Sequence, residues 1–145
     1  MFSRILVPVD GSRNALAALE KAVELQALTD AELKILTVYR HYSLLEASFS
    51  MVRPKEPETM DDAMREHARQ VAEEAKDHAL SLGATDPRAF VKNGPVARSI
   101  IAFAEEHGSD LIVLGSRGLG SIEEYLLGSV SHKITGLARC PVMVV

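Results

Sequence analysis

The chain has 145 residues, 47% hydrophobic and 25% charged, and its 16 basic and 20 acidic residues give a formal net charge of −4. This length predicts a single domain, residues 1–145, that can bury a sizeable core without disulfides. The mild acidity, with no Lys/Arg cluster along the chain, argues against nucleic-acid binding. The one cysteine excludes an internal disulfide and a multi-cysteine metal site.

The hydropathy pattern argues against a membrane protein. The longest apolar runs, such as Ile5–Val9, are far shorter than the ~20 residues that cross a bilayer. The N-terminal residues Met1-Phe2-Ser3-Arg4 lead into that run without the apolar region and cleavage site of a signal peptide. We therefore expect a cytoplasmic protein that does not bind membranes.

The first segments alternate between strand and helix. Ile5–Val9 lacks polar alternation, which predicts a strand buried on both faces. Asp10-Gly11-Ser12 ends that strand, and Ser12 is a suitable N-cap for a helix that runs to about Leu28. A second strand is expected over Leu33–Tyr39.

The next segment, His41–Pro57, has no clear period and carries two prolines. Connections of this length are usually functional lids or disordered, but its apolar residues are equally compatible with a short helix. A helix follows from about Glu58 to Leu82, where apolar residues form one narrow stripe with charges on the other faces. Gly83 supplies its C-cap.

The rest of the chain continues the alternation. Strands are expected at Ala89–Lys92, Leu111–Leu114 and Val142–Val145. Helices are expected from Pro95 until Gly108 stops the helix, and from about Ser129 to Ala138. Strict alternation of strands and helices, together with right-handed crossovers, predicts an α/β fold: a doubly wound, five-stranded parallel sheet with helices on both faces.

Two expected strand ends carry residues suited to a ligand, which in open α/β sheets binds beyond the carboxyl ends of the strands. The first is Pro8-Val9-Asp10-Gly11-Ser12, and the second is the glycine-rich run Leu114–Ser121. Gly128-Ser129-Val130-Ser131 then begins a helix, where unpaired N–H groups and a positive partial charge form a phosphate cradle. Ser129 and Ser131 could add hydroxyl donors.

Taken alone, these glycines leave two interpretations open. They do not form the dinucleotide-binding fingerprint, and the Gly-Lys-Ser/Thr of a Walker A loop is absent from the sequence. Every βα loop also needs turn residues, so anion binding and plain turn chemistry both fit.

The longer spacing is more specific. Gly115-x-x-Gly118, nine residues and then Gly128-Ser129 resembles the nucleotide-binding signature of the universal stress protein family. The resemblance covers nearly the whole chain, in the segments Ile5–Ser12, Leu114–Gly120, Gly128–Ser131 and Cys140–Val145. It implies the strand order 3-2-1-4-5 and membership of the ATP-binding group, because the signature is complete.

The resemblance also implies which residues form the nucleotide site. Carried over by position, they are Pro8, Val9, Asp10, Val38, Leu114, Gly115, Arg117, Gly118, Gly128, Ser129, Val130 and Ser131. Pro8 and Val9 would line the base pocket, Asp10 would meet the ribose or the adenine edge, and Val38 would form an apolar wall. Gly115, Arg117 and Gly118 would border the ribose and phosphates, and Gly128–Ser131 would hold the phosphates. The implied ligand is ATP, or AMP or ADP, with Mg²⁺ held mainly by the phosphates.

The last segment suggests how the protein assembles. Pro141–Val145 is short, uncharged and apolar, so as an edge strand it would be open to pairing with another chain. Self-pairing across a two-fold axis closes such an assembly, and the resemblance implies an antiparallel homodimer through the last strands.

These observations predict a nucleotide-responsive signalling or stress-tolerance module with a signalling partner that the sequence does not identify. A slow ATP hydrolase or phosphotransferase is an alternative, although the sequence offers no Walker lysine or obvious base. A nucleotide-independent dimeric interaction protein is another. A flavodoxin-like electron carrier is disfavoured, because aromatic residues make up 5% of the chain and Trp is absent. The five histidines share no metal-ligand spacing, and Cys140 is expected to be a packed thiol.

Overall fold

The computed structural model describes residues 1–40, 57–118 and 127–145. Its elements are β1 (Arg4–Pro8), α1 (Arg13–Thr29), β2 (Glu32–Tyr39), α3 (Pro57–Ser81), β3 (Arg88–Asn93), α4 (Val96–Glu106), β4 (Leu111–Leu114), α5 (Ser129–Leu137) and β5 (Val142–Val144). All pairs of neighbouring strands are parallel, and the sheet order is β3-β2-β1-β4-β5. The predicted fold class and the strand order 3-2-1-4-5 are therefore confirmed.

Boundaries differ from the expected ones by one or two residues at most ends. The expected first helical residue Pro95 is the N-cap of α4, because its ψ of 128° is extended. Leu82, expected on the apolar stripe of α3, lies beyond the helix end and is 45% exposed. The lid or short helix expected over 41–57 falls almost wholly in residues 41–56, outside the described residues.

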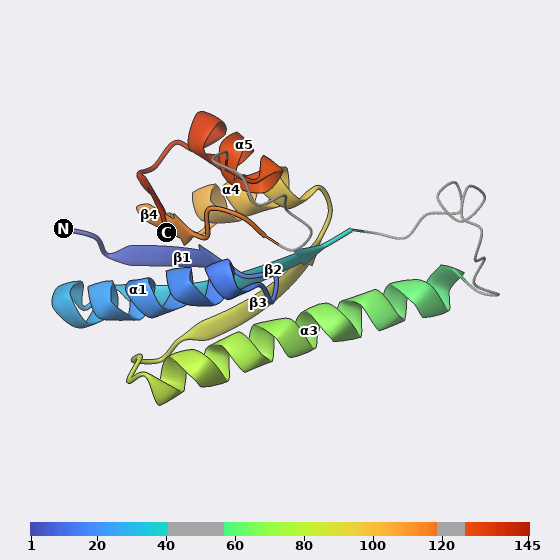
Figure 1. The fold of residues 1–145 in the computed structure, drawn as a ribbon, viewed down its shortest axis with the longest axis horizontal. Coiled ribbons are helices and arrows are strands. Elements are labelled where there is room, and N and C mark those ends of the chain that lie inside the picture. The colour runs from blue at the N-terminus through green and yellow to red at the C-terminus, as the bar shows by residue number, and fades with distance from the viewer. Residues whose placement is uncertain (41–56, 119–126) are drawn as a thin grey trace.

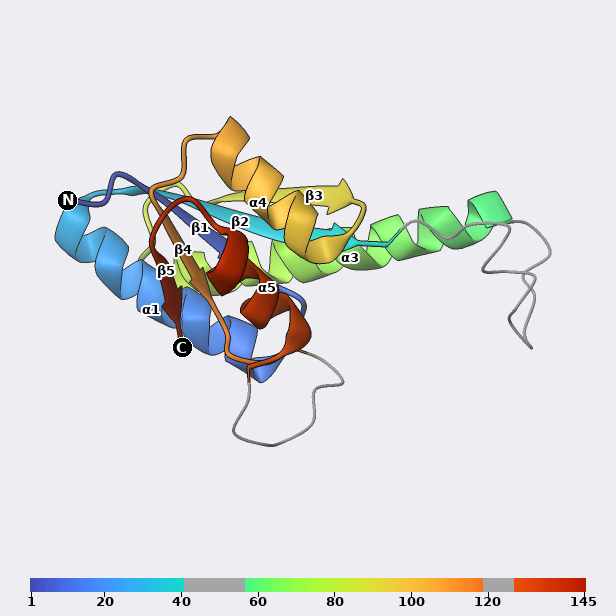
Figure 2. The same cartoon turned by 90° about the horizontal axis from the view of Figure 1, so that it is seen from above.

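Helices cover both faces of the sheet (Figure 1). Helices α1 and α3 pack on one face, and α4 and α5 pack on the other, as the view from above also shows (Figure 2). The central strand is buried on both sides: Ile5 and Val7 face α1, whereas Leu6 faces α4 and α5. Within the described ranges, no helix is both long and apolar enough to cross a membrane.

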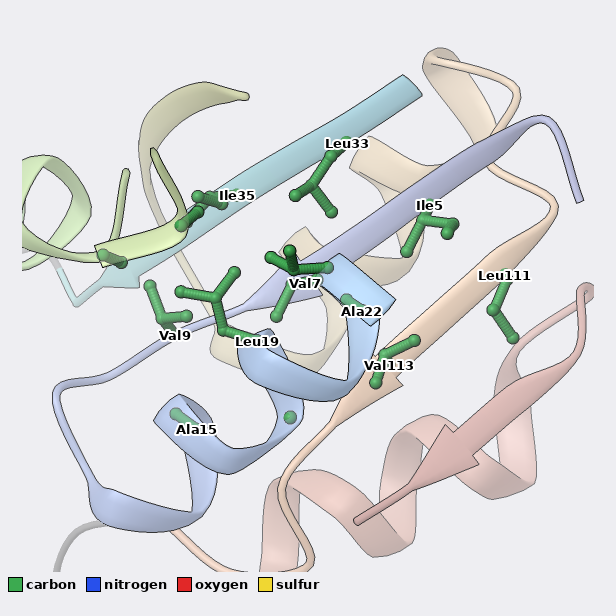
Figure 3. Close-up of a cluster of buried hydrophobic side chains, with 14 of the residues drawn as sticks. Ile5, Val7, Val9, Ala15, Leu19, Ala22, Leu33, Ile35, Leu111 and Val113 are labelled. Carbon is green, nitrogen blue, oxygen red and sulfur yellow. The ribbon is translucent and has the colours of Figure 1, made fainter. Parts of the chain in front are cut away.

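Helix α1 lies close to the sheet because small residues form its buried face. Ala15, Leu19 and Ala22 face Val7 and Val113 of the two central strands (Figure 3). The N-terminus of α1 is held by Ser12, whose hydroxyl oxygen accepts a hydrogen bond from the Ala15 N–H at 3.2 Å. This capping bond begins α1 directly after the loop that follows β1, as the sequence indicated.

A single carboxylate ties the start of β1 to the start of β4. Asp110 accepts hydrogen bonds from the backbone N–H groups of Ser3 at 2.8 Å and Arg4 at 3.0 Å. Its own N–H donates to the Arg4 carbonyl at 2.9 Å. Burial works to raise the pKa of Asp110, but the hydrogen bonds from Arg4 and Ser3 outweigh it and hold the pKa below its ordinary value of 3.8.

Because the folded-state pKa of Asp110 is depressed, its bonds stabilise the fold above the unfolded-state pKa and are lost as the pH falls through the folded-state pKa. We expect Asp110→Asn to lower the free energy of unfolding by up to about 1 kcal/mol near pH 7, since solvent screens the carboxylate. The difference from wild type should vanish by about pH 2. Urea denaturation followed by circular dichroism measures this, with Glu106→Gln as a surface control. An unchanged difference across that range would contradict the assignment.

Candidate functional site

A pocket opens at the carboxyl ends of the central strands β1 and β4, where the strand order reverses. All twelve residues singled out from the sequence line it: Pro8, Val9, Asp10, Val38, Leu114, Gly115, Arg117, Gly118, Gly128, Ser129, Val130 and Ser131. Ser12, from the first of the two strand ends noted in the sequence, also lines it, and five further lining residues were not foreseen: Ala15, Leu36, Val96, Ile100 and Ile134. Gly120 and Ser121, from the same glycine-rich run, lie outside the described residues.

The first glycine of the signature is required by packing. Gly115 follows β4 directly, and a Cβ placed on it would lie 2.7 Å from the backbone carbonyl carbon of Asn14 in α1. Backbone of a helix cannot move aside as a flexible side chain can, so a larger residue at this position would push α1 away from the sheet. The close approach of α1 to β4 therefore depends on this glycine.

The second glycine makes room for a carboxylate. A Cβ on Gly118 would collide with Oδ2 of Asp10. The other oxygen of Asp10, Oδ1, accepts a hydrogen bond from the Ser12 N–H at 2.9 Å. Asp10 thus supports the turn before α1 and at the same time lies at the pocket rim against the loop after β4.

Helix α5 directs its N-terminus at the pocket. Gly128 is the N-cap, with φ −61° and ψ 162°, and its N–H donates to the Ser116 carbonyl at 2.8 Å. The Gly128 carbonyl accepts from the His132 N–H at 2.9 Å, the first bond of the helical pattern. The N–H groups of Ser129, Val130 and Ser131 precede that bond and have no acceptor within the helix, so they add positive partial charge to the pocket wall.

The structure changes the expected role of one hydroxyl. Ser131 is 4% exposed, and its hydroxyl donates to the Gly115 carbonyl at 2.7 Å. This hydrogen bond joins the start of α5 to the loop that follows β4. The Ser131 hydroxyl proton is therefore already used, and only the backbone N–H of Ser131 is left to donate to a ligand. Ser129 lines the pocket and is exposed, so its hydroxyl is accessible to solvent.

The inner wall of the pocket is apolar. Leu36 and Val38 come from the end of β2, and Val96 and Ile100 come from the start of α4. The volume of this half-open pocket is about 150 Å³, below the roughly 300 Å³ at which sites for whole drug-sized ligands begin. It suits a flat ring, with the rest of a ligand extending toward the rim. The α4 residues carry no local signal in the sequence, because only the crossover places α4 against β2.

Among the lining residues that the structure describes, Asp10 and Arg117 carry charge. In the described ranges, no group of three His, Cys, Asp or Glu side chains is placed to hold a metal ion. Cys140 lies outside the pocket, and burial raises the pKa of its thiol above the ordinary value, as fits a packed cysteine. His67 and His132 are exposed.

The fold and this pocket define a doubly wound α/β protein with a glycine-lined site at its topological switch point. The model of the universal stress protein family matches residues 1–145, and the chain belongs to that family. It is 38% identical to the universal stress protein YxiE of Bacillus subtilis over 149 residues, which covers 100% of this chain and 99% of the relative.

Solved structures agree. The universal stress protein UspA from Lactobacillus plantarum superposes with a TM-score of 0.82 at 27% identity, covering 99% of this chain and 97% of that one. A universal stress protein solved in complex with cAMP has a TM-score of 0.75 at 26% identity, with 99% and 97% of the two chains covered.

We expect Gly115→Ala to lower the free energy of unfolding by about 1–3 kcal/mol, because the added methyl group must displace the backbone of α1. Gly136→Ala is the matched control: it lies within α5, a Cβ there meets no atom within 4 Å, and alanine favours the helix. Urea denaturation of both variants measures the effect. Equal stabilities of the two variants would refute the packing argument.

Proposed function

We propose that this universal stress protein binds ATP, or AMP or ADP, in the switch-point pocket and acts as a nucleotide-responsive signalling or stress-tolerance module. The observation that carries the proposal is the convergence of the twelve singled-out residues, from four separate segments, on one pocket. The relative solved with cAMP supports a nucleotide as the ligand class, since it is similar over 99% of this chain.

The adenine base fits the enclosed apolar part of the pocket. Val9 and Val38 would pack against the ring, and Pro8 would close the wall on the β1 side. Asp10 lies at the rim beside the end of β1, where its carboxylate can accept a hydrogen bond from a ribose hydroxyl or from the amino group of adenine.

The phosphates fit the start of α5. The N–H groups of Ser129, Val130 and Ser131 would donate to phosphate oxygens, together with the Ser129 hydroxyl, while Gly115, Gly118 and Gly128 let the backbone approach closely. Arg117 supplies the cation at the rim. Since the described residues hold no carboxylate cluster, a Mg²⁺ ion would be bound mainly by the phosphates.

We further propose that the protein is a homodimer through β5, the edge strand of the sheet. The Pro141 carbonyl and the Val145 N–H bond to β4, so the two-residue repeat of a strand turns the N–H of Val144 to the outer side. That outer edge is uncharged and apolar, which leaves it open to pairing with a second copy. A signalling partner would then recognise the surface of the dimer with nucleotide bound in its pockets.

Calorimetric titration of ATP with Mg²⁺ into the full chain tests the nucleotide proposal. We expect micromolar binding, equivalent to about 8 kcal/mol, from protein verified free of carried-over nucleotide. The double variant Gly128→Ala, Ser129→Ala should weaken it at least about tenfold, because it loses a donor and adds a methyl group at the closest approach. The φ of −61° at Gly128 suits alanine, so the variant should fold.

The matched control for this titration is Gly136→Ala, Ser81→Ala, which makes the same two changes away from the pocket. It should bind like the wild type. Absence of binding to the wild-type protein would instead favour a nucleotide-independent interaction protein. If ATP binding were weakened equally in both double variants, the proposed position of the phosphates at the start of α5 would be wrong.

For the dimer, we expect Val144→Pro to give a monomer in sedimentation analysis, where the wild type sediments as a dimer. Proline removes the outward N–H and leaves the β4 bonds in place. Val144→Ala keeps that N–H and should remain dimeric. A monomeric wild type, or a dimeric proline variant, would contradict pairing through β5.

A further inference from the structure

Helix α3 is attached to the sheet by small side chains. Among its described side chains, the buried ones are four alanines, each at most 3% exposed: Ala68, Ala72, Ala75 and Ala79. The other two long helices bury larger groups, such as Leu19 in α1 and Phe103 in α4. An alanine methyl group removes less apolar surface from water than these side chains do, so packing holds α3 less strongly. The first turns of α3 also project beyond the carboxyl ends of the strands (Figure 1, Figure 2).

A buried hydroxyl faces this helix from the sheet. Thr37 of β2 is 6% exposed, and its Oγ1 has no hydrogen-bond partner among the described residues. Because side chains alternate along a strand, Thr37 points to the same face as Tyr39, whose hydroxyl accepts a hydrogen bond from Arg65 of α3. The residue opposite Thr37 in β3 is Val91, which has no polar side-chain atom to offer. The hydroxyl of Thr37 therefore lies unpaired between the sheet and α3.

The position of α3 along β2 shows which alanines cover Thr37. Arg65 lies at Tyr39, and α3 runs from there in the direction opposite to the strand. Two strand residues span about 6.6 Å and four helical residues about 6 Å, so Ala68 and Ala72 lie over Thr37. Among the described residues, these two alanines belong to neither hydrophobic core cluster. A buried hydroxyl without a partner loses its bonds to water, which weakens the attachment of α3 at this place.

The carboxyl end of α3 is held more firmly. The side-chain amide of Gln26 in α1 donates to the Thr85 carbonyl at 2.9 Å and accepts from the Thr85 N–H at 3.0 Å. Between that point and the helix lies Gly83, with a φ of +94° that favours glycine. Helix α3 is thus attached weakly along its middle and firmly just beyond its end, and the turn at Gly83 forms a pivot between the two.

We propose that α3 undocks from the sheet about this pivot while the other elements stay folded, and that the unpaired hydroxyl of Thr37 sets the fraction of molecules in the undocked form. When α3 leaves, water can bond to the hydroxyl, which offsets part of the cost of exposing the alanines. Helix α3 is rich in Ala, Glu, Lys and Arg, which favour a helix without support from the sheet. Undocking therefore does not require the rest of the fold to open.

Helix α3 also contacts two segments that form the switch-point pocket. Val71 packs against the loop after β1, where a Cβ on Gly11 would lie 3.8 Å from its Cγ2. The hydrogen bond to Tyr39 reaches the residue that follows Val38 of the pocket wall. Docked α3 supports both segments, so a nucleotide that binds the pocket in this shape disfavours undocking by reciprocity. This coupling rests on the proposed function, whereas the undocking itself does not.

Thiol labelling of the full chain, in a Cys140→Ser background, tests the proposal. Ala75→Cys places a thiol beneath α3 without offering Thr37 a sulfur partner, and Ala22→Cys places a matched thiol beneath α1. Without ligand, a bulky thiol reagent should react at least about tenfold faster at position 75 than at position 22, which requires global unfolding. Thr37→Val keeps the shape of the side chain and removes the unpaired hydroxyl. It should slow labelling at position 75 at least about fivefold.

Ile112→Val is the control, because it trims a buried side chain of β4 that α3 does not cover. It should speed labelling at position 22 and leave position 75 unchanged, since the contacts of Ile112 persist when α3 undocks. Equal labelling rates at the two positions, or an unchanged rate at position 75 in Thr37→Val, would overturn the proposal.

The coupling to the pocket is tested by adding ATP with Mg²⁺ to the Ala75→Cys protein, after calorimetry on the same protein. Saturating ATP should slow labelling at position 75 at least about tenfold. Measured binding with an unchanged labelling rate would overturn the coupling. Absence of binding in the calorimeter would contradict the proposed function alone, because undocking is measured without ligand.

Discussion

The central strand β1 is paired with β2 on one side and with β4 on the other, and the rest of the structure depends on this arrangement. The connection after β1 leads to the α1 face, whereas the chain after β4 leads to α5 on the opposite face. Two adjacent strand ends whose loops diverge to opposite faces leave a crevice between them. The pocket lies in that crevice, and the remaining walls come from β2, α4 and α5.

Three consecutive residues, Leu114, Gly115 and Ser116, connect the pocket to the edge strand β5. The Leu114 carbonyl accepts from the Val145 N–H, and the Ser116 N–H donates to the Val145 carbonyl, both at 2.9 Å. Gly115 and Ser116 also accept from the Ser131 hydroxyl and the Gly128 N–H at the start of α5. The pocket wall, the helix N-terminus and the β5 edge therefore share one network of hydrogen bonds.

The positive potential at the pocket comes more from the fold than from charged side chains. In the pocket, positive potential comes mainly from backbone N–H groups at a helix start, with one carboxylate and one guanidinium at the rim. Backbone amides are available for any sequence that makes the turn.

Much of this architecture could be predicted from the sequence, because its signals are local. The uninterrupted apolar run before Pro8 indicates a strand buried on both faces, and Ser12 marks the helix start to the residue. The spacing of Gly115, Gly118 and Gly128 indicated a site, and the residues that the resemblance implied line one pocket. Glycine spacing carries such information because the absence of a side chain is required wherever backbones approach closely.

What the tertiary structure decided depends on residues far apart in the chain. Val96 and Ile100 line the pocket because α4 crosses above β2, which no local pattern records. The hydroxyl of Ser131 binds the Gly115 carbonyl, 16 residues away, rather than facing a ligand. The Nε–H of Arg65 in α3 donates to the hydroxyl oxygen of Tyr39 in β2, 26 positions away, which no local pattern indicates. Local patterns determine elements and turns, but which side chains meet at a surface is set by how the elements pack.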